Sequence, residues 1–203
     1  LANGYIYLTY NARRTQHALL HISGNSMVYF NGEPRGGDIY SDGWLNIPVT
    51  LIKGVNEILI RCGNFSRWQG VSARLIFPAK SVTINTRDAT LPHIVIGKSD
   101  QPLSGAVVIV NASGKPLSGL SIASKMNGQV TETAVNDLGP GAIRKTGFVF
   151  DASRVTVAGD HTCALQLKQN GKVLDEKSIT VAAVEKHQHH SYTFTSAIDG
   201  SIQ

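Results

Sequence analysis

The chain has 203 residues, of which 42% are hydrophobic and 16% are charged, and its formal net charge is +5. This composition is sufficient for a packed core and excludes an intrinsically disordered chain. The basic residues are scattered, with Arg13-Arg14 as the tightest cluster, whereas nucleic-acid-binding domains usually gather their cations along one stripe. We therefore expect no nucleic-acid partner. We also expect no membrane span, because no apolar run approaches the ~18 residues that one requires.

The first part of the chain, residues 1–80, is predicted to be a β-sandwich. Apolar residues alternate with polar ones in the stretches "YIYLTYNA", "HALLHIS" and "VSARLIFP". Turn signals recur about every ten residues, and no stretch has the 3.6-residue period of a helix. This pattern is typical of a jelly roll or a related sandwich.

The segment 79–90 is more polar than its neighbours, and we place the domain boundary there. Residues 91–184 then form a second series of about seven short strands, with Asn127-Gly128 and Asn170-Gly171 as hairpin turns. Residues 185–203 are predicted to be a linker toward a further domain. The predicted fold class is therefore all-β, with two consecutive β-sandwiches, the first a jelly roll and the second immunoglobulin-like.

The two cysteines, Cys62 and Cys163, fall in different predicted domains, so we expect two free, buried thiols. Histidines cluster at His187, His189 and His190, where two of them could share one side of a strand and bind a metal ion. A closed zinc site needs four ligands, and no cysteine or carboxylate pattern completes one nearby. We interpret this tract as a polar linker and predict no metal site and no cofactor.

Catalytic motifs are missing from the sequence. It contains no G-x-S-x-G nucleophile elbow, no dinucleotide-binding fingerprint and no P-loop. Carboxylate pairs for glycoside hydrolysis could come from Asp38 with Asp42 or from Glu33 with Asp38, but each pair lies within one glycine-rich loop. Such chemistry requires two carboxyl groups held across a cleft. We expect this chain not to be an enzyme by itself.

The glycine-rich loop "EPRGGDIYSDGW" has two interpretations. It can be a structural corner in which Gly36-Gly37 lets the chain reverse and Trp44 packs under its own loop. Alternatively, Trp44 and Tyr40 in this loop, and Trp68 in a second loop, can present aromatic faces to a sugar. The residues Arg67 and Asn64 would then bond its hydroxyl groups. The candidate sugar-binding residues are Trp44, Trp68, Arg67 and Asn64, and the corner is our first interpretation of the loop.

The stretch "VYFNGEPRGGDIY…LNIPVTLIKGVNEILIR" resembles the galactose-binding-like jelly-roll domains of secreted bacterial hydrolases. The matching residues are Val28, Tyr29, Asn31, Gly32, Leu51, Gly54, Asn56 and Ile58. Asn31-Gly32 suits a tight turn, and Gly54 with Asn56 suits the next one. Domains of this fold often bind nothing, so the resemblance implies no particular ligand.

The second half resembles CARDB-type immunoglobulin-like modules in "GKPLSGL", "LGPGAIRKTGF" and "AGDHTCALQLKQNGKVLDEKSI". The ending "YTFTSAIDGSIQ" is similar to the lead-in to the α/β-hydrolase domain of secreted prolyl-oligopeptidase-like peptidases. Together these resemblances imply a non-catalytic, N-terminal accessory region of a secreted or periplasmic bacterial hydrolase. Its partner would be a catalytic domain further along the same polypeptide, which it would position or shield. The alternative is a carbohydrate-binding module.

Overall fold

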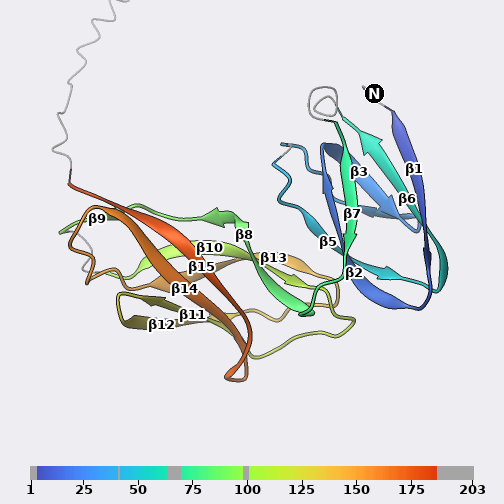
Figure 1. Cartoon of the computed structure of the whole chain (residues 1–203). Coiled ribbons are helices and arrows are strands. Elements are labelled where there is room, and N and C mark those ends of the chain that lie inside the picture. The colour runs from blue at the N-terminus through green and yellow to red at the C-terminus, as the bar shows by residue number, and fades with distance from the viewer. Residues whose placement is uncertain (1–3, 41, 64–69, 98–100, 187–203) are drawn as a thin grey trace, which may run out of the picture.

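A computed structural model describes residues 4–40, 42–63, 70–97 and 101–186. These residues form fifteen β-strands, and no helix occurs among them. The strands form two β-sandwiches that follow one another along the chain (Figure 1). The predicted all-β class with two consecutive sandwiches is confirmed.

The first sandwich consists of a four-stranded sheet in the order β1-β6-β3-β4 and a three-stranded sheet in the order β5-β2-β7, all antiparallel. Its strands are β1 (Tyr5–Ala12), β2 (Gln16–Ser23), β3 (Asn25–Phe30), β4 (Glu33–Arg35), β5 (Asn46–Leu51), β6 (Gly54–Cys62) and β7 (Ser72–Ile76). Alternate residues of these strands face inward and form one core, which includes Leu20, Ile22, Val28, Ile58 and Ile60.

The second sandwich consists of a three-stranded sheet in the order β13-β10-β8 and a five-stranded sheet in the order β12-β11-β14-β15-β9. All of its pairs are antiparallel except that of β9 with β15. Its strands are β8 (Val82–Thr90), β9 (Ile94–Val95), β10 (Leu103–Asn111), β11 (Leu120–Met126), β12 (Gln129–Val135), β13 (Ile143–Phe150), β14 (Gly159–Gln169) and β15 (Lys172–Val184). A separate core lies between these sheets, and Phe148 and Phe150 are among its largest side chains.

Three hairpins turn at Asn-Gly pairs in which both residues have positive φ. The φ angles are 49° and 81° at Asn31-Gly32, 45° and 83° at Asn127-Gly128, and 48° and 81° at Asn170-Gly171. Two successive positive φ angles are the geometry of a type I′ turn, which Asn-Gly adopts more easily than other pairs. The predicted turns are confirmed.

The segment 79–90 is mostly strand, although it was expected to be the boundary between the domains. β8 pairs with β10 and therefore belongs to the second sandwich, which begins before residue 91. Only Val82 and Ile84 of β8 are buried. The rest of the strand is mostly polar and half-exposed or exposed, and its sequence therefore does not show the alternation that predicts a strand. The chain passes from β7 to β8 through residues 77–81.

Asn31 and Asn56, two of the residues on which the predicted resemblance rests, have structural roles here. Asn56 is fully buried, and its amide nitrogen donates to the carbonyl oxygens of Ile52 at 2.8 Å and Gly54 at 3.0 Å. Its Oδ1 accepts hydrogen bonds from the Ile52 backbone N–H at 2.9 Å and from the Asn31 side chain at 3.0 Å. Asn56 thus stabilises the turn before β6 and joins it to the β3–β4 hairpin.

Candidate functional site at the junction of the two sandwiches

An apolar seam joins the two sandwiches. Leu19 and Ile76 of the first sandwich pack against Val108, Val110 and Ala112 of the second, and Leu19 and Val110 are only 6% and 2% exposed. These side chains point away from the two main cores, because successive residues of a strand face opposite sides of its sheet. The outer faces of β2 and β10 therefore bury one another at this seam.

Polar contacts extend the junction beside the apolar seam. The side-chain amide of Asn85, on β8, donates to the backbone carbonyl of Trp44 at 2.9 Å. The guanidinium group of Arg87 donates to the carbonyl of Gly43 at 3.4 Å. Both bonds hold the loop between β4 and β5 against the second sandwich.

Asp38 organises this loop from within. Its side chain is buried, and its carboxylate accepts hydrogen bonds from the backbone N–H groups of Gly24 at 3.1 Å, Asp42 at 3.1 Å and Gly43 at 3.0 Å. Gly37 approaches β3 so closely that a Cβ atom there would lie 2.1 Å from the carbonyl oxygen of Ser26. The corner interpretation of the backbone is thus supported, with Gly37 as the glycine that the corner requires. The expected packing of Trp44 under its own loop is wrong, because Trp44 is 41% exposed.

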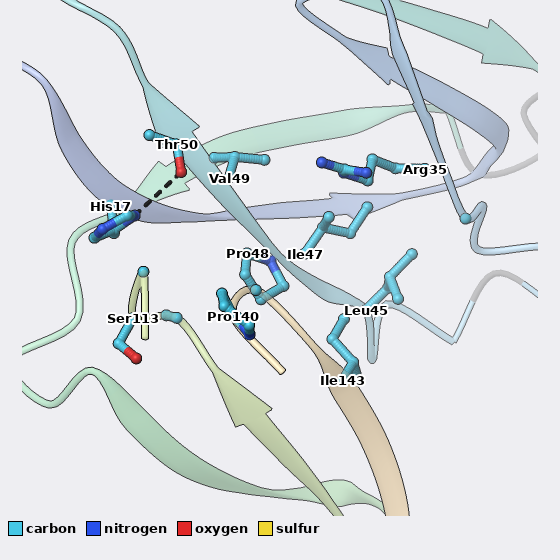
Figure 2. A pocket seen from close by; sticks show the side chains of 14 residues that line it. His17, Arg35, Leu45, Ile47, Pro48, Val49, Thr50, Ser113, Pro140 and Ile143 are labelled. Atoms are coloured by element: carbon cyan, nitrogen blue, oxygen red, sulfur yellow. Dashed lines mark hydrogen bonds between the residues drawn. The ribbon is translucent and has the colours of Figure 1, made fainter. Parts of the chain in front are cut away.

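Two cavities lie along the junction, and the larger has a volume of about 510 Å³. Figure 2 shows it between β5 of the first sandwich and the loops around Ser113 and Pro140 of the second. His17 Nδ1 lies 3.1 Å from Thr50 Oγ1 at one side, and Arg35 at the other side is paired with Glu33. The centre of the wall is apolar, with Pro48 and Ile47. The polar side chains of His17, Thr50 and Arg35 in this cavity are thus already engaged with neighbours.

The second cavity, of about 420 Å³, is the better candidate site, and we name it the Trp44 cleft. The loop between β4 and β5 forms one wall and strands β8, β10 and β13 form the other. Tyr40 is 76% exposed and Trp44 41% exposed. The residues that line it are Gly37, Asp38, Ile39, Tyr40, Asp42, Trp44, Leu45, Asn46, Asn85, Asp88, Val108, Val110 and Ile143. The cleft thus combines exposed aromatic side chains with carboxylates and amides.

Some polar groups of the Trp44 cleft already have hydrogen-bond or ion-pair partners, and others do not. The carboxylate of Asp88 forms an ion pair with Lys145, with Oδ1 lying 2.7 Å from Nζ. Asn46 Oδ1 lies 3.0 Å from His21 Nδ1, and the Asn85 amide is bound to Trp44. The carboxylate of Asp42 has no hydrogen-bond or ion-pair partner among the residues that the structure describes. Asp42 is therefore the charged group that a ligand can reach without displacing another contact.

Of the predicted sugar-binding residues, the structure places Trp44 at this cleft. Asn64, Arg67 and Trp68 lie outside the described residues, as do the three clustered histidines. Sequence reasoning missed Asn85 and Asp88, which it assigned to a boundary segment. Their polar side chains on a half-buried strand were the available signal, but the sequence does not show that this strand lies opposite Trp44.

The arrangement does not favour chemistry by the proposed carboxylate pairs. Both oxygens of Asp38 accept backbone N–H groups, and Glu33 is paired with Arg35. Within the described ranges, no group of three or more His, Cys, Asp or Glu side chains could hold a metal ion. The same part of the chain contains no helix with the length and apolarity needed to cross a membrane.

Sequence comparisons give no relatives: no protein-family model matches this chain, and a search of curated proteins finds no match. Solved structures resemble it in shape. A GH2 β-galacturonidase from Eisenbergiella tayi has a TM-score of 0.44 at 10% sequence identity. The similarity covers 88% of this chain and 35% of the galacturonidase chain. For β-glucuronidase 2 from Bacteroides uniformis the TM-score is 0.46 at 11% identity, over 89% of this chain and 26% of its own.

The CARDB domain of PF1109 from Pyrococcus furiosus has a TM-score of 0.36 at 16% identity, over 53% of this chain and 96% of its own. This chain spans only about a quarter to a third of the glycosidase chains that it matches. The similarities concern shape alone, so functional arguments must come from the residues of this chain.

Proposed function

We propose that the two sandwiches are a non-catalytic accessory region of a larger secreted or periplasmic bacterial hydrolase, where they position or shield its catalytic domain. The observation that carries this proposal is the apolar seam of Leu19, Ile76, Val108, Val110 and Ala112. Sandwiches joined by a flexible polar linker would reorient freely, whereas a buried apolar contact favours one orientation. A pair with one orientation can hold an attached domain in a defined place.

The connection between the sandwiches supports the same function. The carbonyl of Ser81 accepts a hydrogen bond from the Ala112 N–H at 2.7 Å. The ammonium group of Lys80 lies 2.9 Å from the buried carboxylate of Asp175 on β15. The connecting residues are thus attached to the second sandwich, which leaves only residues 77–79 to act as a hinge.

We propose a serine peptidase as the parent on the resemblance of residues 192–203 alone. These residues lie outside the described part of the chain. A polypeptide whose reading frame continues into a domain with a G-x-S-x-G elbow would support this parent. A continuation into a glycosidase domain would replace the peptidase and leave the accessory role in place.

Substitution of Leu19 by Asp tests the positioning role. Leu19 faces the seam and not the core, so each sandwich should stay folded while the charge opens the junction. Residual dipolar couplings should report a single alignment for both sandwiches in the wild type and separate alignments in Leu19→Asp. The matched control is Val130→Asp, at an exposed position on β12. Independent alignment of the sandwiches in the wild type would refute the proposal.

Carbohydrate binding is the second candidate function, and the Trp44 cleft is the observation that favours it. Sugars have apolar faces and polar edges, which match exposed aromatic rings beside carboxylates and amides. Tyr40 and Trp44 could contact a sugar face, and Asp42 and Asn46 could bond its hydroxyl groups. A site with so few anchors should bind weakly, with a Kd of about 1 mM.

The two tryptophans allow this function to be tested at each predicted location. In Trp68→Phe, Trp44 is the only tryptophan, and in Trp44→Phe only Trp68 is left. Titration of both variants with neutral oligosaccharides should change the emission of the first variant if the cleft binds them. A change confined to the second variant would move the site to residues 64–69, and no change in either would exclude carbohydrate binding at a tryptophan.

A further inference from the structure

The Trp44 cleft has carboxylates on both walls and no basic side chain among the described residues that line it. Asp38 and Asp42 come from the loop between β4 and β5, and Asp88 comes from β8 on the opposite wall. No Lys, Arg or His is among those lining residues. The charged side chains that line the cleft are therefore all acidic, although Lys145 pairs with Asp88 and Arg87 bonds to Gly43 beside Asp42.

The three carboxylates differ in how far their charge is compensated. Asp38 is surrounded by backbone N–H donors, and Asp88 is paired with Lys145. Arg87, near the cleft, directs its guanidinium group to the Gly43 carbonyl. Asp42 alone has no direct partner among the described residues. The uncompensated charge of the cleft is thus that of Asp42.

We infer that the Trp44 cleft selects neutral or amino sugars and rejects uronic acids, with Asp42 as the residue that determines this specificity. The inference rests on the carbohydrate-binding function proposed above. An ammonium group on a sugar seated over Trp44 could pair with Asp42. A uronate at the same place would bring its carboxylate close to that of Asp42, whereas the cations of Lys145 and Arg87 are already engaged with Asp88 and the Gly43 carbonyl. Like charges at short range repel.

The test uses the Trp68→Phe variant, so that Trp44 reports binding. Tetrasaccharides of glucosamine, glucose and galacturonic acid are titrated in a mildly acidic buffer, in which the amino sugar is charged. Galacturonic acid should bind at least about tenfold more weakly than glucose, and glucosamine at least as tightly as glucose. Added salt should reduce these differences, because it screens exposed charges.

Replacement of Asp42 by Asn should remove the discrimination. Relative to its affinity for the glucose tetrasaccharide, affinity for the glucosamine tetrasaccharide should fall and that for the galacturonic acid tetrasaccharide should rise, each by about three- to tenfold. The matched control is Asp160→Asn, which makes the same charge change at an exposed site on β14. It should leave all three affinities unchanged.

The outcomes separate this inference from the function on which it rests. If none of the three saccharides alters Trp44 emission, carbohydrate binding at the cleft fails and the inference fails with it. If glucose binds but galacturonic acid binds equally well or better, binding stands and the inference is overturned. An equal effect of Asp42→Asn and Asp160→Asn would assign the discrimination to net charge and also overturn it.

Discussion

The side-chain amide of Asn85 donates to the backbone carbonyl of Trp44 across the junction, at 2.9 Å. The two residues lie in different sandwiches, 41 positions apart in the sequence. The bond fixes the backbone that carries the Trp44 ring, so the geometry of the cleft depends on the orientation of the second sandwich. A ligand in the cleft would contact both sandwiches and stabilise this arrangement relative to one in which the junction is separated.

Gly37 and Gly36 should respond very differently to alanine. A Cβ atom at Gly37 would lie 2.1 Å from the Ser26 carbonyl oxygen, whereas at Gly36 no atom lies within 4 Å. We expect Gly37→Ala to reduce the free energy of unfolding by about 2 kcal/mol or more, as overpacking does. Gly36→Ala should change it by less than about 0.5 kcal/mol. Urea unfolding measures both values, and equal effects would contradict the close approach to β3.

Asn56→Ala should destabilise the first sandwich by about 3 kcal/mol, because the buried Asn56 side chain makes three part-buried hydrogen bonds to backbone groups that would lose their partner. Asn56→Asp should be as harmful, since it keeps the acceptor but loses the donor and introduces a buried charge. Asn11→Ala, at an exposed position of β1, is the matched control. Thermal unfolding should show both Asn56 variants to be much less stable than Asn11→Ala. A mild effect of Asn56→Ala would show that water replaces the side chain.

Asp175 should make stability depend on pH in the acid range. Burial, the largest single influence, raises the pKa of this carboxyl group, but hydrogen bonds from the Ile84 N–H and Lys80, with the nearby charge of Lys177, together lower it. Because the pKa of Asp175 is lower in the folded state, its ionised carboxylate contributes its full stabilisation at pH values above the pKa of the unfolded state, about 3.9. This contribution is lost as the pH falls through the folded pKa.

We therefore expect Asp175→Asn to be less stable than the wild type at neutral pH. The difference between them should shrink as the pH falls below about 4. Urea unfolding of both proteins at a series of pH values gives this difference directly. A difference that stays constant down to the acid transition would mean that Asp175 acts through its shape and not through its charge.

Both cysteines should be inert in the folded protein. Cys62 and Cys163 are free and buried, in different sandwiches. Burial raises the pKa of the Cys163 thiol to about 11, so the reactive thiolate is scarce at mildly alkaline pH. We expect iodoacetamide to modify neither residue until the protein is unfolded, and then to add two adducts by intact mass. Rapid modification of Cys163 in the native state would contradict its burial.

The features that could be predicted from the sequence are local ones. Asn31-Gly32 and Asn170-Gly171 specify their turns through their own backbone preferences, so no distant residue is needed to recognise them. The alternation in β6 likewise indicates a strand with one buried face. These signals determine the class of the fold.

The cleft could not be predicted in the same way. Asn85 and Asp88 reach it only because the outer faces of β2 and β10 pack together, and this contact joins residues far apart in the sequence. From the sequence, Val108 and Val110 look like core residues of the second sandwich. Nothing in the local sequence shows that the first sandwich covers them. The structural role of Asp38 was missed for the same reason, since one of its donors, Gly24, lies in a different turn.

We expect the outer edge of β1 to affect how this chain behaves in concentrated solution. β1 pairs with β6 on one side and has no partner strand on the other among the described residues. Natural edge strands usually carry a charge, a proline or a bulge against pairing with other molecules. "YIYLTYNA" has neither charge nor proline, and it exposes Tyr5, Tyr7 and Leu8. If the two sandwiches self-associate at high concentration, β1 should be the strand that pairs first, and the substitution Thr9→Lys should oppose this pairing.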